Sequence, residues 1–117
     1  MKQYSRAERV GGLIQQALAD ILTKRIKDPR LELATITQVK MTRDLRIARI
    51  YFSITGGPEK IKAAEQGFKS AIGFVKRDLS RQLELRYMPS IEFYYDDSFD
   101  YGSHIDKLLK SIATKHD

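Results

Sequence analysis

The chain of 117 residues contains no cysteine. It can therefore form no disulfide, no thiolate metal site and no cysteine nucleophile. It also contains no apolar run near the roughly 20 residues needed to cross a bilayer. Its first five residues, MKQYS, lack the apolar core of a signal peptide. These absences predict a cytosolic protein that does not contact a membrane.

The composition indicates a globular protein with a basic body. Hydrophobic residues make up 42% of the chain, and a chain of this size can bury roughly two-thirds of its unfolded surface. We expect a single domain over residues 1–117, with a core at about 5–97 and a C-terminal helix at about 103–115. The net charge is +6, although six acidic residues outnumber three lysines within residues 87–117. This asymmetry favours a polyanionic partner bound on one side.

The first predicted element is a helix. Ser5 and Glu8 have the spacing of a capping box, and apolar residues then recur every three or four positions from Val10 to Ile26. The Asp28-Pro29 pair ends this pattern, because proline disfavours helical geometry in the residue before it.

Three strands and a long helical region follow. Residues 33–42 are rich in threonine and β-branched residues, and residues 48–54 alternate apolar with polar side chains, so the short connection between them predicts a hairpin. Residues 91–95 alternate in the same way after the helical region, which predicts a third strand parallel to a neighbour. The predicted fold class is therefore α+β, with the helices packed on one face of a three-stranded mixed sheet.

The helical region from residue 61 to 83 carries the clearest chemical signal. Gly73 lies in its middle, where glycine costs about 1 kcal/mol relative to alanine and marks a common site for a bend. We therefore expect two helical halves joined by a kink at residues 71–73. Four cations flank the kink: Lys69, Lys76, Arg77 and Arg81. This arrangement suits close approach of a phosphate backbone, although a solvated basic helix face with an incidental glycine accounts for it equally well.

No catalytic or metal-binding pattern is present. Both histidines, His104 and His116, lie near the C-terminus, away from any nucleophile–base arrangement. A calcium loop beginning at Asp96 would need glycine at its sixth position and glutamate at its twelfth, where the chain has Tyr101 and Lys107. We expect no enzyme activity, no catalytic residue, no metal and no cofactor.

The predicted order of elements is that of a KH-type RNA-binding domain in its second topology. Such domains hold single-stranded nucleic acid, usually with a Gly-x-x-Gly loop. This chain lacks that loop, and the sequence AIG at 71–73 occupies its place. A kink at Gly73 would expose backbone N–H groups at the start of the second helical half, where the helix dipole favours an anion.

Several short segments occur in a characteristic order between about Ser5 and Leu109. They are DPR at 28–30, ARIY at 48–51, AIG at 71–73, LRYMP at 85–89 and FYYD at 93–96. Taken together, they resemble the bacterial ribosome-binding factor A family, a family with a KH-like domain. The resemblance implies a non-enzymatic assembly factor that binds the free 30S small ribosomal subunit, assists late maturation of the 5′ region of 16S rRNA and supports growth in the cold. It also implies release by a ribosome-associated GTPase, and we expect a monomer.

The resemblance also implies RNA contacts at the kink and the adjacent basic helix, and more loosely at basic residues elsewhere. The predicted RNA-binding residues are Lys69, Ala71, Gly73, Lys76, Arg77, Arg81, Arg43, Arg46, Arg6 and Arg9.

Two other functions remain open at this point. A general KH-like protein would bind single strands of messenger or small RNA, and Tyr51 or Arg49 would then stack on bases. A protein-interaction module would instead use the acidic C-terminal part, and its binding would survive nuclease and high salt.

Overall fold

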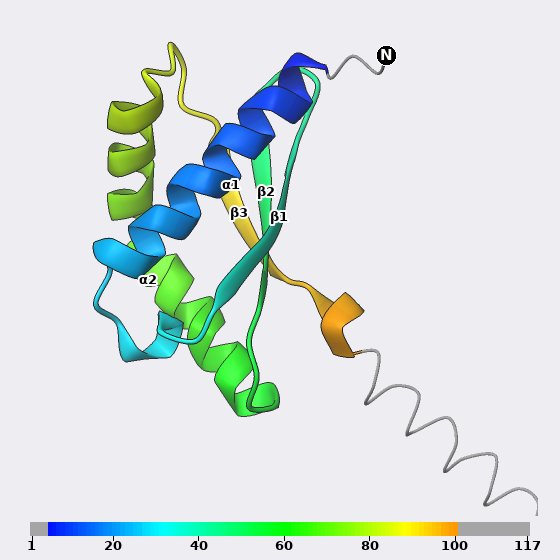
Figure 1. The fold of residues 1–117 in the computed structure, drawn as a ribbon, viewed down its shortest axis with the longest axis vertical. Coiled ribbons are helices and arrows are strands. Elements are labelled where there is room, and N and C mark those ends of the chain that lie inside the picture. Colours follow the sequence, from blue (N-terminus) through cyan, green and yellow to red (C-terminus); the bar gives the residue numbers. More distant parts are fainter. Residues whose placement is uncertain (1–4, 101–117) are drawn as a thin grey trace, which may run out of the picture.

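The computed structural model describes residues 5–100, and Figure 1 shows two helices packed on one face of a sheet. The elements in chain order are α1 (Arg6–Lys24), η1 (Pro29–Leu31), β1 (Thr35–Met41), β2 (Ile47–Ser53), α2 (Pro58–Leu83), β3 (Ser90–Tyr95) and η2 (Asp97–Asp100). The sheet has the order β1-β2-β3, with β1 antiparallel and β3 parallel to β2. The predicted α+β fold class and the parallel third strand are confirmed. The helix predicted at about 103–115, with both histidines, lies outside the described residues.

The first helix begins as predicted and ends earlier. The Ser5 hydroxyl oxygen accepts the backbone N–H of Glu8 at 3.1 Å, which confirms the N-terminal cap. The helix ends at Lys24 rather than at the Asp28-Pro29 pair. Asp28 caps η1 instead, because its carboxylate accepts the backbone N–H of Arg30 at 2.9 Å. The proline therefore starts a short helical turn and does not end the long helix.

A β-bulge at Thr37 sets which side chains of β1 face the helices. Ile36 pairs with Phe52 and Gln38 pairs with Tyr51, so Thr37 is an extra residue on its strand. The bulge shifts the alternation by one, and both Ile36 and the half-buried Val39 therefore pack against the core. The Thr37 hydroxyl donates to the Asp96 carboxylate instead.

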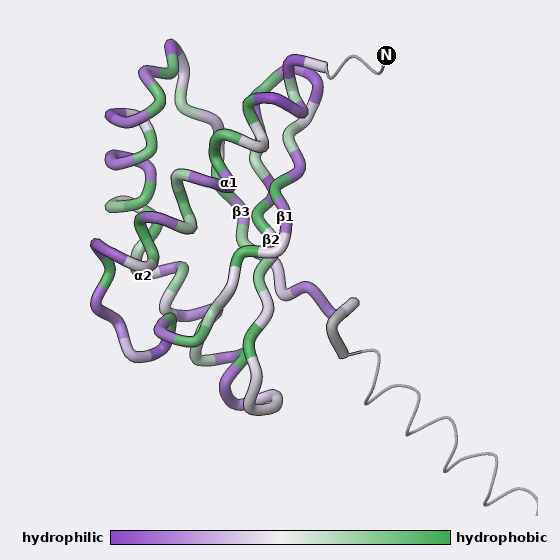
Figure 2. Tube along the Cα trace, viewed as in Figure 1, coloured by the Kyte–Doolittle hydropathy of each residue, from purple (hydrophilic) through white to green (hydrophobic). Residues whose placement is uncertain are grey.

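The core lies between the sheet and the two helices. Its largest fully buried side chains are Phe52, Phe68, Ile14, Leu18, Ile21, Ile50, Leu79 and Val75. The ring of Phe68 contacts both Phe52 and Phe93, with centroids 4.8 and 4.5 Å apart. Figure 2 shows the alternation of hydrophobic and hydrophilic residues along the chain that produces these one-sided elements.

The second helix is one continuous element of 26 residues. Figure 1 shows that α2 changes direction about midway along its length, without an interruption of the helix. The kink expected from the sequence is therefore present as a bend within one continuous helix, and the two halves are not separate elements. Neither described helix contains a stretch apolar enough and long enough to span a membrane.

Candidate nucleic-acid interface

Four of the predicted RNA-binding positions form one exposed line along α2. Lys69, Gly73, Arg77 and Arg81 follow one another at steps of four, which places them on the same side of a helix. All four are exposed, and none of the three cations forms an ion pair with a described residue. We call these four residues the basic stripe. Lys76 lies beside the stripe and is half-buried.

The two small residues of the AIG segment have different surroundings. A Cβ added at Gly73 would meet no atom within 4 Å, so packing does not require glycine there. Its missing side chain leaves a gap in the stripe between Lys69 and Arg77. Ala71 is half-buried and packs against the core, so the structure does not place it on the stripe. The sequence predicts that the two residues act together, but only Gly73 lies on the exposed surface.

The expected anion site at backbone N–H groups near Gly73 is wrong. Residues 73–77 lie inside a continuous helix, where each N–H donates to the carbonyl four residues earlier. Only the first four N–H groups of a helix lack such a partner. A phosphate at this surface must therefore be held by the side chains of the basic stripe.

The remaining predicted cations come from other elements. Arg6 at the start of α1 and Arg46 after the β1–β2 turn line the same cavity, of about 620 Å³. Arg86, between α2 and β3, lines it too and is not among the residues predicted from the sequence. Arg9 and Arg43 are exposed and do not line this cavity. The structure therefore brings together two predicted residues and adds a third cation to them.

The carboxylate beside these arginines is held within its own turn. Asp44 accepts the Thr42 hydroxyl at 2.6 Å and the backbone N–H of Arg46 at 3.1 Å. These bonds, the one from Thr42 above all, hold the pKa of Asp44 below its ordinary value. Asp44 is therefore a structural anion of the β1–β2 turn.

The open face of the sheet carries a second kind of surface. The rings of Tyr51 and Tyr94 stack with centroids 5.6 Å apart, and the Lys40 ammonium lies 5.6 Å from the Tyr51 centroid. The Tyr94 hydroxyl donates to Glu92 at 2.7 Å, which raises the pKa of Tyr94. Arg49 approaches the same Glu92 carboxylate at 3.6 Å. Tyr51 and Arg49, considered above as base-stacking residues, are thus already engaged with their neighbours across the strands.

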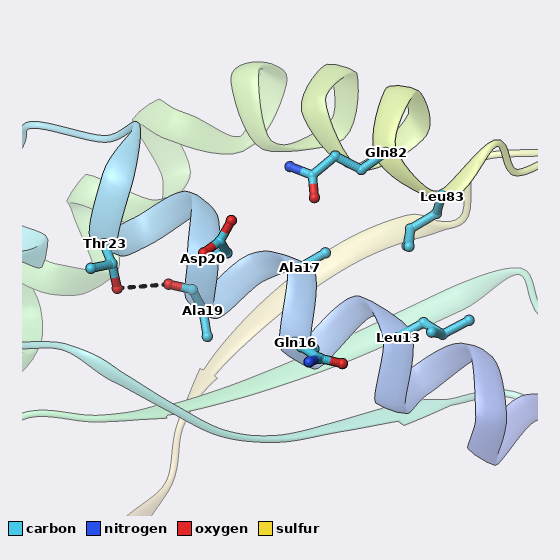
Figure 3. A pocket seen from close by; sticks show the side chains of 8 residues that line it. All are labelled: Leu13, Gln16, Ala17, Ala19, Asp20, Thr23, Gln82 and Leu83. Atoms are coloured by element: carbon cyan, nitrogen blue, oxygen red, sulfur yellow. Dashed lines mark hydrogen bonds between the residues drawn. The ribbon is translucent and has the colours of Figure 1, made fainter.

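A groove between α1 and the end of α2 is chemically different from the basic surfaces. Figure 3 shows side chains from both helices around it, including Leu13, Gln16 and Gln82. Within residues 5–100, no lysine or arginine lines this groove, and its Asp20 carboxylate pairs with Lys24 at 3.0 Å. It therefore offers no positive charge that would attract a phosphate.

Asp96, the first carboxylate after β3, is bound by neighbouring groups of the protein. Asp96 is buried, and its carboxylate accepts the hydroxyl groups of Ser98 and Thr37, each at 2.6 Å. These hydrogen bonds hold the pKa of Asp96 below its ordinary value. The bond from Ser98 has the largest effect, and the bond from Thr37 the next largest. Among the described residues, no three His, Cys, Asp or Glu side chains are grouped as a metal site.

Thr37→Val is expected to lower the free energy of unfolding at neutral pH by about 2 kcal/mol, because Asp96 loses a donor to its buried charge. A carboxyl whose pKa is lowered by folding stabilises the folded protein at pH values above the ordinary pKa of that carboxyl. This stabilisation is lost as the pH falls through the lowered pKa. Urea unfolding at pH 7 and near pH 3 should therefore show a smaller difference between variant and parent at the lower pH.

Thr35→Val serves as the control for this pair, since Thr35 is exposed on the same strand. An equal loss of stability in the two valine variants at pH 7 would contradict the role given to Thr37.

Comparison with known proteins gives a consistent result. The family model of ribosome-binding factor A matches residues 6–109. The ribosome-binding factor A of Desulfatibacillum aliphaticivorans is 53% identical over 113 residues, covering 97% of this chain and 92% of that protein. That of Desulfosudis oleivorans is 49% identical over 117 residues, covering 100% of this chain and 91% of that protein.

A solved structure and a fitted homology model of a relative have the same fold. The crystal structure of ribosome-binding factor A from Thermus thermophilus superposes with a TM-score of 0.68 at 24% identity, covering 76% of this chain and 93% of that chain. A homology model of the Thermus thermophilus factor, fitted into a cryo-electron-microscopy map of its complex with the 30S, gives 0.64 at 23% identity, covering 81% and 97%. At these identities the likeness shows the fold alone. The family match over residues 6–109 and the relatives at about half identity carry the assignment: the chain belongs to the ribosome-binding factor A family.

Proposed function

We propose that the protein is a non-enzymatic assembly factor that binds the free 30S ribosomal subunit through its 16S rRNA. Membership of the ribosome-binding factor A family is the observation that carries this proposal. The Thermus thermophilus relative has been fitted into a map of a 30S complex, and the basic stripe gives this chain a surface suited to RNA. The protein would act as a monomer in the cytoplasm.

The basic stripe would contact the phosphate backbone through side chains alone. Lys69, Arg77 and Arg81 are exposed and have no described carboxylate to neutralise them. Charges of this kind release condensed counterions when they meet phosphates, which makes binding strongly dependent on salt. The gap at Gly73 would let a strand pass close to the helix between Lys69 and Arg77.

Assistance to rRNA maturation requires no chemistry. A factor that binds two arrangements of the rRNA with different affinities shifts their balance by that difference. Late maturation of the 5′ region of 16S rRNA would follow if the favoured arrangement is the one that is processed, and the effect would matter most in the cold, where wrongly paired RNA persists longer. Release by a ribosome-associated GTPase would complete the cycle.

Sedimentation of the purified protein with free small subunits and with intact ribosomes tests the proposal. We expect a preference for the free subunit. If about five phosphates are neutralised, the salt slope is roughly −3.5, so a fourfold rise in salt should weaken binding on the order of a hundredfold. Failure of the protein to sediment with the free subunit would contradict the proposal.

Two other results would favour the alternatives. Equal binding to every ribosomal particle, together with binding to short single strands, would indicate a general KH-like RNA-binding protein. Binding that survives both nuclease and high salt would indicate a protein-interaction module. Accumulation of precursor 16S rRNA in cells lacking the protein is the expected result if the assembly role is correct.

A further inference from the structure

The cavity of about 620 Å³ lies where three separate segments meet at one end of the molecule. Arg6 and Val10 come from the start of α1, Leu45 and Arg46 from the β1–β2 connection, and Arg86 from the α2–β3 connection. Figure 1 shows these three segments together at the end opposite to the start of α2. A volume of this size is in the range of small-ligand sites, roughly 300–1,000 Å³.

The charge around the cavity favours an anionic ligand. Three arginines, Arg6, Arg46 and Arg86, are among the residues that line it, against one carboxylate, Asp44. That carboxylate already accepts two hydrogen bonds within its own turn, and the Arg46 Nε lies 3.9 Å from it. All three arginines are exposed, and Arg6 and Arg86 form no ion pair with a described residue. The planar fork of a guanidinium group binds phosphate well.

The rest of the wall offers a surface for an aromatic base. The Tyr87 side chain is 77% exposed, which is unusual for a large aromatic residue, and the Arg86 guanidinium lies 5.5 Å from its ring centroid. Val10 and Leu45 add apolar surface beside it. An exposed ring, apolar side chains and nearby arginines are the features with which proteins hold unpaired nucleotides.

The backbone at Leu45 supports the view that this wall is built for a ligand. Its φ is +60°, in the left-handed region that costs a non-glycine residue about 1–2 kcal/mol. Glycine would suit the turn better, yet leucine places an apolar side chain at the cavity. Strained positions of this kind concentrate at functional sites.

We propose that this cavity, the arginine pocket, binds one unpaired nucleotide of rRNA, with its phosphate on the arginines and its base against Tyr87. The proposal rests on the proposed function, because the RNA it requires is that of the small subunit. It adds a contact that depends on an unstacked base, whereas the basic stripe recognises only the phosphate backbone.

The test compares four variants of the full chain for binding to free small subunits. Tyr87→Ala removes the stacking surface, Tyr87→Phe keeps it, and Arg86→Gln removes one charge. Lys60→Gln is the matched charge control, since Lys60 is exposed in the first turn of α2 at the other end of the molecule. All three positions are exposed, and thermal unfolding would check that each variant remains folded.

We expect Tyr87→Ala to weaken binding about tenfold and Tyr87→Phe to bind as the parent does. Arg86→Gln should weaken binding more than Lys60→Gln and reduce the salt slope by about 0.7. Ultraviolet cross-linking of the parent to free subunits, followed by tryptic digestion and fragmentation of the peptide 87–107, should give an RNA adduct on Tyr87 itself.

The failures of the two proposals are distinct. A parent protein that does not bind the free subunit overturns the proposed function. A parent that binds, with Tyr87→Ala and Arg86→Gln as tight as Lys60→Gln, overturns the arginine pocket alone. Cross-linking of Tyr87 to a ribosomal protein in place of RNA also overturns it, because the ring would then lie against protein.

Discussion

Gly67→Ala is expected to lower the free energy of unfolding by about 2 kcal/mol, although alanine is the better helix former. Gly67 is buried where α2 crosses η1, and a Cβ added there would lie 2.9 Å from Leu31 Cδ2 and 3.0 Å from Leu31 Cγ. Leu31 belongs to the core and is 4% exposed, so it has little room to move. Urea unfolding of the variant should show the loss as a lower midpoint with an unchanged slope.

Gly73→Ala, on the same helix, is the matched control and should raise the free energy of unfolding. An added Cβ at Gly73 meets nothing within 4 Å, so the substitution gains helix propensity, about 1 kcal/mol, at no steric cost. The free energies of unfolding of the two alanine variants should therefore differ by about 3 kcal/mol. Equal effects would mean that the close approach of η1 to α2 does not limit the residue at Gly67.

The Gly73→Ala variant has a further use for function. Because it should fold more stably than the parent, any loss of subunit binding cannot be assigned to unfolding. A weaker complex would then show that the gap between Lys69 and Arg77 allows close approach of RNA. Unchanged binding would show that the cations of the basic stripe act without it.

Local signals explain why much of the fold could be predicted from the sequence. The cap at Ser5 and the alternation along residues 48–54 depend on neighbours in the chain, and both are found where they were expected. The end of α1 was placed too late because the Asp28-Pro29 pair marks a boundary without saying which element it belongs to. The bulge at Thr37 is defined by how β1 pairs with β2, so it cannot be recognised from the residue pattern of β1 alone.

The candidate site was harder to predict, because its parts meet only in the folded chain. Gly67 and Gly73 look alike in the sequence, and their difference arises from Leu31, far away in the chain. Arg86 belongs to a segment that carries the family resemblance, but its role appears only where it meets Arg6 and Arg46 at one cavity. The spacing of the basic stripe, in contrast, is a property of one helix and could be read directly.

Arg77→Glu combined with Arg81→Glu should weaken binding to the free 30S subunit by about a thousandfold at moderate salt. Two attractions to phosphate are lost and two repulsions replace them, and a change of about 1 kcal/mol for each of these four effects gives that factor. Both side chains are exposed and lack a described ion-pair partner, so the fold should tolerate the change. Sedimentation and circular dichroism would measure binding and folding on the same samples.

Lys60→Glu combined with Lys62→Glu is the control that separates a local contact from net charge. It changes the charge of the protein by the same amount, on the same helix, at exposed positions in the first turns of α2. A general attraction between a basic protein and RNA would make the two double variants equally weak. If the basic stripe binds rRNA, only the Arg77 and Arg81 variant should lose the thousandfold, because repulsion between exposed charges is screened beyond about 10 Å at ordinary ionic strength. Equal losses of affinity in the two double variants would mean that the basic stripe contributes only to the overall positive charge. The arginine pocket would then be the specific RNA contact.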